Sequence, residues 1–223
     1  MFEKVECTAY AEFDLCADGP VLVSSGKSNK TNPTLPDNTF MTGFCGAEHK
    51  DEMYVIPGST IKGIFRHSID EHTAFGIFGS KGERCNNNFY PMQKSKIKFN
   101  DAFAVPDSVV TTIRYSTAIN PAKQSPAYNS LNNMAVIEKG TFKAGFIFKN
   151  YTEAEMEKIL LALYDVNEGT VRFGGKISRG FGKMRVENFS MKVNNGFDEN
   201  LTPKLEIVFS SIDAAYKHFR KAE

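Results

Sequence analysis

The chain has 223 residues, of which 41% are hydrophobic and 24% are charged, as expected of one globular domain. Because 27 lysines and arginines almost balance 26 acidic residues, the net charge of +1 does not itself indicate nucleic-acid binding, and any basic surface must be local. No apolar run approaches the roughly 18 residues that a membrane-spanning helix needs, so we expect no membrane partner. The first ten residues have the pattern of a charged strand rather than a signal peptide. No two of the four cysteines have C-x-x-C spacing, and we expect a cytoplasmic protein with reduced thiols.

The first part of the chain predicts a strand, a long loop and a helix. Residues 3–16 are rich in β-formers and predict the strand, whereas residues 17–55 are rich in Gly, Ser, Asn, Thr and Pro and predict the loop. Apolar residues recur at helical spacing over residues 61–74. Ser59 or Thr60 is expected to cap this helix.

The middle of the chain predicts mainly β structure. A polar loop at residues 80–94 leads to a second strand at residues 95–104. Two β-like pieces flank an Asn/Pro/Ser-rich centre in residues 106–140, which predicts a protruding hairpin. Residues 141–149 alternate strictly and predict a third strand.

A second helix and a fourth strand complete the pattern. Thr152 and Glu155 have the spacing of a capping box, and an apolar face follows them. Residues 182–193 predict the fourth strand, and the tail predicts a short strand at 205–209 and a helix at 212–221.

The resulting order is that of an α+β, ferredoxin-like or RRM-like βαββαβ fold. We expect one domain over residues 1–223, with insertions at about 17–55 and 76–94. The hairpin at about 106–140 is expected to protrude from it.

The first motif that indicates chemistry is IPGSTIKGIFR, residues 56–66. A turn feeds a helix N-terminus, whose free N–H groups and positive dipole end favour a phosphate. Ser59 and Thr60 add hydroxyl groups, and Lys62 and Arg66 share one helical face. The alternative is an ordinary helix with two solvated cations.

The second motif is GGKISRGFGK, residues 174–183. Its glycines permit close backbone approach to a ligand, its cations supply charge, and Phe181 offers a stacking face. Alone it matches neither a P-loop nor a dinucleotide fingerprint, and a flexible turn is the alternative.

Together the two motifs, with Phe78-Gly79-Ser80 between them, resemble the CRISPR-associated RAMP superfamily. Residues 117–121 and 136–142 resemble the hairpin and following strand of type III (Csm-type) effector backbone subunits. The resemblance covers about residues 5–190.

The resemblance implies a hand-shaped subunit that holds guide RNA (crRNA). Its RRM-like palm contacts guide phosphates, and its thumb hairpin inserts into the guide–target duplex and kinks out one nucleotide per subunit. Copies of the chain would oligomerise along the guide, beside target RNA and other CRISPR effector subunits. The tip of the thumb would include Ile119 and Asn120. The expected RNA contacts are Ser59, Thr60, Lys62, Arg66, Lys176, Ser178, Arg179 and Lys183.

The resemblance also raises the question of target cleavage. Type III backbone subunits cut target RNA through an acidic residue in the first loop with a divalent metal, and the nearest candidate is Asp37, with Mg²⁺ as cofactor. The spacing from Asp37 to the first motif is longer than in the family pattern. An Asp after Pro in a polar loop is commonly a turn residue, so the alternative is a subunit that only holds RNA.

A structural zinc site is a further expectation, because some RAMP relatives carry zinc beside the first helix. The preferred ligands are Cys45, His49, His67 and Cys85, with His72 as a fifth candidate. Scattered surface histidines and buried cysteines are the alternative.

Two other functions stay open at this point. A guide-processing RAMP endonuclease would need a histidine as general base in the RNA path. A capping subunit would bind one end of the guide without forming a polymer. A generic RRM module is disfavoured because no aromatic pair matches its RNP1 pattern.

Overall fold

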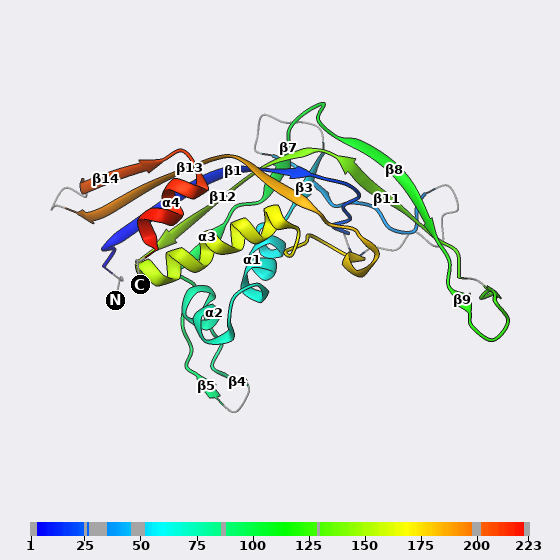
Figure 1. Ribbon diagram of the computed structural model, residues 1–223, viewed down its shortest axis with the longest axis horizontal. Helices are drawn as coiled ribbons and strands as arrows, with labels where there is room; N and C mark the ends of the chain where they lie inside the picture. The colour runs from blue at the N-terminus through cyan, green and yellow to red at the C-terminus, as the bar shows by residue number, and fades with distance from the viewer. Residues whose placement is uncertain are drawn as a thin grey trace.

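A computed structural model describes residues 4–24, 26, 35–45, 52–85, 88–128, 130–197 and 202–220. Figure 1 shows a twisted sheet with helices on one face and a long hairpin extending away from it. Among the described residues, no helix is long and apolar enough to cross a membrane.

The centre of the sheet has the predicted ferredoxin-like topology. The strands run in the order β13-β1-β12-β6/β7, and every neighbouring pair is antiparallel. If the four predicted strands are numbered along the chain, their order across the sheet is 4-1-3-2. This order is that of a ferredoxin-like fold and confirms the α+β prediction. The bounds are β1 Cys7–Ala17, β6 Ile97–Phe99, β7 Ala102–Ala104, β12 Thr141–Lys149 and β13 Met184–Phe197.

Further strands extend both edges of this centre. On one side β14 (Pro203–Phe209) pairs with β13. On the other side β3 (Met53–Ile56) pairs with β7, and β2 (Thr42–Gly43) pairs with β3. The region predicted as one long loop over 17–55 therefore contributes two short strands, because its final apolar residues find a partner in β7.

The predicted helix at 61–74 is wrong in its bounds. The chain forms two helices, α1 (Gly58–His67) and α2 (Glu71–Phe78), and it breaks between them. The break is stabilised by Asp70, whose Oδ1 accepts a hydrogen bond of 3.0 Å from the Thr73 N–H and caps α2. Helix α1 begins before Ser59 and Thr60, so neither of them is its cap; Pro57 holds that position.

The polar loop predicted after this helix contains a small hairpin. Strand β4 (Glu83–Cys85) pairs with β5 (Asn88–Tyr90), and both lie below α2 in Figure 1. The Tyr90 ring stacks on Phe75 of α2, with centroids 3.8 Å apart. This stacking attaches the small hairpin to α2.

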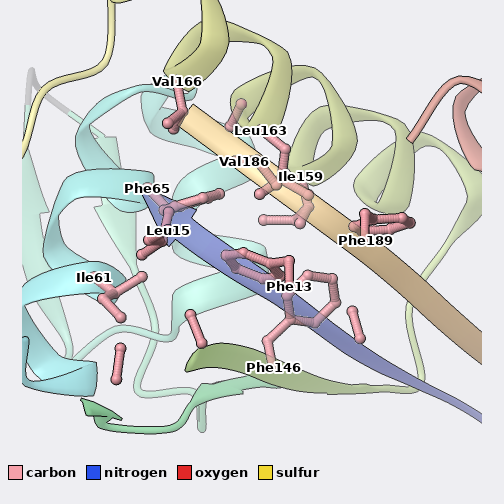
Figure 2. Packing of buried hydrophobic residues seen from close by; sticks show 14 of the residues in the cluster. Phe13, Leu15, Ile61, Phe65, Phe146, Ile159, Leu163, Val166, Val186 and Phe189 are labelled. Atoms are coloured by element: carbon pink, nitrogen blue, oxygen red, sulfur yellow. The ribbon is translucent and has the colours of Figure 1, made fainter. Parts of the chain in front are cut away.

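Helix α3 (Glu153–Glu168) covers the sheet as its apolar pattern predicted. Both bonds of the Thr152–Glu155 capping box are present, at 2.8 and 3.2 Å. Figure 2 shows Ile159 and Leu163 of α3 facing Phe13 and Phe146 of the sheet. All of these side chains are buried, and each contributes roughly 1.5–3 kcal/mol by leaving water. Helix α4 (Ile212–Phe219) packs beside α3.

The predicted hairpin at 106–140 is present and extends far from the sheet (Figure 1). Its long strands are β8 (Val110–Ser116) and β11 (Asn132–Lys139), and its far end carries β9 (Ile119–Asn120) and β10 (Ser125–Pro126). Its outward side chains include exposed apolar groups, namely Ile113, Tyr115, Ile119, Tyr128 and Leu131.

Candidate nucleic-acid interface

The two sequence motifs meet in one open groove of about 480 Å³, which we call the glycine-loop groove. The first turn of α1 contributes Thr60, and the glycine-rich loop contributes Gly174, Gly175 and Lys176. The polypeptide that follows β1 supplies the rest of the lining, which is Leu22, Val23, Ser24 and Asn38. Hydroxyl, amide and ammonium groups thus converge from three separate parts of the chain.

The glycine-rich loop is held in this groove by close backbone contact. Gly174 has φ +80°, and a Cβ there would lie 2.2 Å from the Leu22 carbonyl oxygen. That same oxygen accepts a hydrogen bond of 2.9 Å from the Gly175 N–H. Residues Ile177–Arg179 then form one 3-10 turn, on which Ser178 and Arg179 are exposed. The loop therefore needs glycine for its docking and leaves its polar side chains outside.

The segment 20–24, which we call the strap, joins this loop to the long hairpin. Val21 and Ile137 of β11 exchange two backbone hydrogen bonds of 2.8 and 3.0 Å. The strap also accepts two hydrogen bonds from the glycine-rich loop. The Leu22 carbonyl accepts from the Gly175 N–H, and the Pro20 carbonyl accepts from the Gly182 N–H at 2.8 Å. One short segment thus contacts both parts of the candidate interface.

The N-terminus of α1 is partly satisfied within the protein. The Gly58 N–H donates to Asp101 Oδ1 at 2.7 Å, and a Cβ on Gly58 would lie 2.4 Å from the Phe99 carbonyl oxygen. Ser59 is exposed beside this contact. Asp101 thus takes the place of an N-terminal cap, and an anion at this helix end would meet Ser59 and Thr60 rather than Gly58.

Lys62 and Arg66 lie in a neighbouring groove of about 520 Å³, which we call the α1 groove. The Arg66 Nη1 donates to the Gly79 carbonyl at 2.9 Å, and its guanidinium lies 4.7 Å from the centroid of the Phe75 ring. Arg66 therefore joins α1 to α2 as well as lining the groove. Burial, and then the nearby charge of Arg66, lower the pKa of the Lys62 ammonium, so an anion in this groove would offset repulsion between the two cations.

Lys183, expected as an RNA contact, has a partner within the protein. Its Nζ lies 2.9 Å from Asp18 Oδ2, and this ion pair lowers the pKa of the Asp18 carboxyl. The Asp18 N–H also donates to the Lys183 carbonyl. Lys183 thus anchors the end of β1 to the start of β13.

The carboxylate of Asp37 bonds to the long hairpin. The Asn133 N–H donates to Asp37 Oδ2 at 2.9 Å, and the Asp37 N–H donates to Asn133 Oδ1 at 2.5 Å. The next residue, Asn38, accepts from the Ala135 N–H and lines the glycine-loop groove. Asp37 therefore lies beside the groove, with one of its carboxylate oxygens used to hold the first loop against β11.

The described residues do not assemble a metal site around these positions. Within them, no three His, Cys, Asp or Glu side chains come together at metal-binding distance. Cys45, His67 and Cys85 therefore do not form a group, and the fourth expected ligand, His49, lies outside the described residues. Asp37 likewise belongs to no described group of three such side chains that could hold Mg²⁺. Zinc and magnesium stay predictions.

The two residues expected at the tip of the long hairpin, Ile119 and Asn120, have different surroundings. The Asn120 Oδ1 accepts from the Ala122 and Lys123 N–H groups at 3.0 and 3.2 Å, so Asn120 shapes the turn. Ile119 is 63% exposed and points away from any core. Sequence reasoning missed Tyr115 and Tyr128, which are exposed as well; the only signal for them was an aromatic residue within a polar hairpin.

Comparison with known proteins agrees with this geometry. The fold is that of a ferredoxin-like α+β protein with its polar groove at the junction of α1 and a glycine-rich loop. Residues 44–185 match the family model of the RAMP superfamily, and the chain belongs to that superfamily.

Among solved structures, the chain is similar to one from the cryo-EM structure of the Type III-B Cmr-beta bound to cognate target RNA. The TM-score is 0.54 at 17% identity, and the match covers 82% of this chain. It covers 60% of that chain, so this protein spans well under its full length. No curated protein matches this sequence.

Proposed function

We propose that the chain is a crRNA-binding backbone subunit of a type III, or type III-derived, CRISPR effector complex. The observation that carries this proposal is the convergence of Thr60, Gly174, Gly175 and Lys176 in one groove. Backbone N–H groups and cations that converge on one concave surface suit phosphates and read no base sequence. Membership of the RAMP superfamily supports RNA as the ligand.

The long hairpin is the thumb of this proposal. It carries exposed apolar and aromatic side chains far from the core, of which Tyr128 is 98% exposed. Such side chains are costly in water and stack favourably on bases, so the tip is suited to enter a guide–target duplex and displace a nucleotide. Copies of the chain would then assemble along the guide, each with its own thumb.

The test is to measure particle mass with and without a guide RNA and with complementary RNA. A series of masses that grows with guide length supports the backbone role. A single one-to-one complex refutes it and favours the capping or guide-processing alternatives. The double variant Lys176→Gln/Arg179→Gln should abolish assembly, whereas Lys204→Gln/Lys217→Gln, with the same change of charge at exposed sites outside the grooves and the hairpin, should assemble normally.

A second candidate function is target cleavage by Asp37 with a divalent metal. It is supported by the position of Asp37 beside Asn38, which lines the groove. Asp37→Asn keeps an oxygen that can accept from the Asn133 N–H, whereas Asp37→Ala removes it and should cost about 1 kcal/mol of stability. If Asp37 is catalytic, both variants lose regularly spaced cuts in labelled target RNA with Mg²⁺. If cuts persist in the Asn variant, Asp37 only holds the loop.

A further inference from the structure

We propose that a third groove, at the opposite end of the sheet, binds the phosphodiester backbone of single-stranded RNA and extends the RNA path. This inference rests on the proposed function, because it takes RNA as the ligand of the chain. We call the site the lysine groove. Its volume is about 480 Å³, and its described lining is Val5, Met92, Gln93, Lys94, Ser95, Lys96, Lys98, Ile147, Lys149 and Asn150.

The described charged residues that line this groove are all basic. Four of its described lining residues are lysines, and none of those residues is acidic. Lys96 is neutralised by Glu155, whose carboxylate oxygens lie 2.8 and 3.0 Å from its Nζ. Lys94, Lys98 and Lys149 form no ion pair with any residue in the described ranges. Three like charges around one concavity repel each other, and this cost is recovered when a polyanion lies among them.

Three of the lining residues, Lys98, Ile147 and Lys149, lie on the face of the sheet that the helices leave uncovered. Phe146 and Phe148 of β12 are buried under the helices, so Ile147 between them points to the other face. Lys98 lies directly opposite Ile147 on β6. Both lysines of these paired strands, Lys98 and Lys149, are therefore fixed on rigid elements rather than on a mobile loop.

An aromatic ring adjoins these lysines. Tyr10 of β1 is the partner of Ile147 on its other side, so Lys98, Ile147 and Tyr10 form one row across three strands. Tyr10 is 43% exposed on the same open face. An exposed ring beside unpaired cations is the combination that binds a single strand, because bases stack while phosphates pair with lysine. An acidic protein surface would use the lysines and leave the ring without a role.

The lysine groove is continuous with the sites already described. Gln93 and Ser95 line both this groove and the α1 groove. Helix α1 in turn reaches from Thr60 in the glycine-loop groove to Lys62 in the α1 groove. Lys149 in the lysine groove pairs with Thr8 of β1, and from Thr8 to the end of β1 at Ala17 the strand spans about 30 Å at roughly 3.3 Å per residue. The glycine-loop groove lies beyond that end of β1.

The test is fluorescence anisotropy of labelled oligouridines with the full chain over a range of salt concentrations. A strand of about 5 nucleotides, stacked at about 3.4 Å each, cannot reach both ends of the path, whereas one of about 20 can. The variant is Lys94→Gln/Lys98→Gln/Lys149→Gln. Its control is Lys158→Gln/Lys204→Gln/Lys217→Gln, which removes three exposed lysines that line none of the three grooves.

We expect the groove variant to bind the long RNA at least about tenfold more weakly, with the salt dependence of log K reduced by roughly 2, from about 0.7 for each lost phosphate contact. The control should bind both RNAs normally, and the groove variant should lose less affinity for the short RNA, because a short strand can bind in the glycine-loop groove alone. Tyr10→Ala should also weaken the long RNA, and Tyr10→Phe, which keeps the ring, should not.

Three results would overturn this inference. If the groove variant and its control bind the long RNA equally while Lys176→Gln/Arg179→Gln fails to bind, the proposed function stands and the lysine groove is no RNA site. If the groove variant changes only self-association, the groove binds a protein surface. If the unmodified chain binds neither RNA, the proposed function itself fails.

Discussion

The substitution Gly174→Ala tests why glycine is needed at this position. Glycine is required either by the close contact with Leu22 or only by the positive φ of the backbone. At φ +80° the new Cβ would lie 2.2 Å from the Leu22 carbonyl oxygen, far inside contact distance. Gly180 is the matched control, because it has φ +87° and no described atom lies within 4 Å of its Cβ position. Both alanines carry the left-handed backbone cost of about 1–2 kcal/mol.

At Gly174 the Leu22 carbonyl must also move, which breaks its hydrogen bond from Gly175 and adds at least about 1 kcal/mol. We therefore expect Gly174→Ala to lower the free energy of unfolding by roughly 3 kcal/mol and Gly180→Ala by roughly 1 kcal/mol. Equilibrium urea unfolding followed by circular dichroism measures both. Losses that agree to within about 0.5 kcal/mol would refute the contact argument, since only the contact distinguishes the two sites.

Three further changes test other parts of the structure. Gly63→Ala on α1 should raise the free energy of unfolding by up to about 1 kcal/mol, because its Cβ would meet no described atom. A thermal melt measures this change, and a lower melting temperature would contradict the expectation. Asp70→Ala should cost about 1 kcal/mol at pH 7 through loss of the α2 cap. The Thr73 N–H lowers the pKa of Asp70, so this contribution is complete above the unfolded value and is lost as the pH falls below 3.8; a loss independent of pH in urea titrations would contradict the cap. Leu163→Ala should cost about 2–5 kcal/mol by leaving a cavity under α3, and a smaller shift in the urea midpoint would mean that the sheet collapses onto it.

The sequence predicted the elements whose signals are local. The Thr152–Glu155 capping box and the alternation in residues 141–149 each depend on neighbours a few positions apart, and both were confirmed. The break between α1 and α2 was missed because Ile61, Phe65 and Ile69 keep a helical spacing straight through it. The Asp70 side chain nevertheless caps a new helix, which begins at Glu71.

Contacts between distant parts of the chain could not be predicted in this way. The bond from the Gly58 N–H to Asp101 joins residues 43 positions apart, and nothing near either residue indicates it. The role of Asp37 is similar, because its partner Asn133 lies 96 positions away. The resemblance assigned both motifs to one RNA ligand, and in the structure Thr60 lines one groove with Gly174, Gly175 and Lys176. It did not predict that Lys62 and Arg66 would lie in a separate, adjoining groove.

The strap has a mechanical consequence. It is bonded at Val21 to the base of the hairpin and at Leu22 to the glycine-rich loop, with no spare residue between these attachments. A displacement of the hairpin is therefore passed directly to the glycine-rich loop through the backbone hydrogen bonds at Val21 and Leu22. The position of the hairpin and the shape of the groove are in this way coupled through a single peptide unit, the one between Val21 and Leu22.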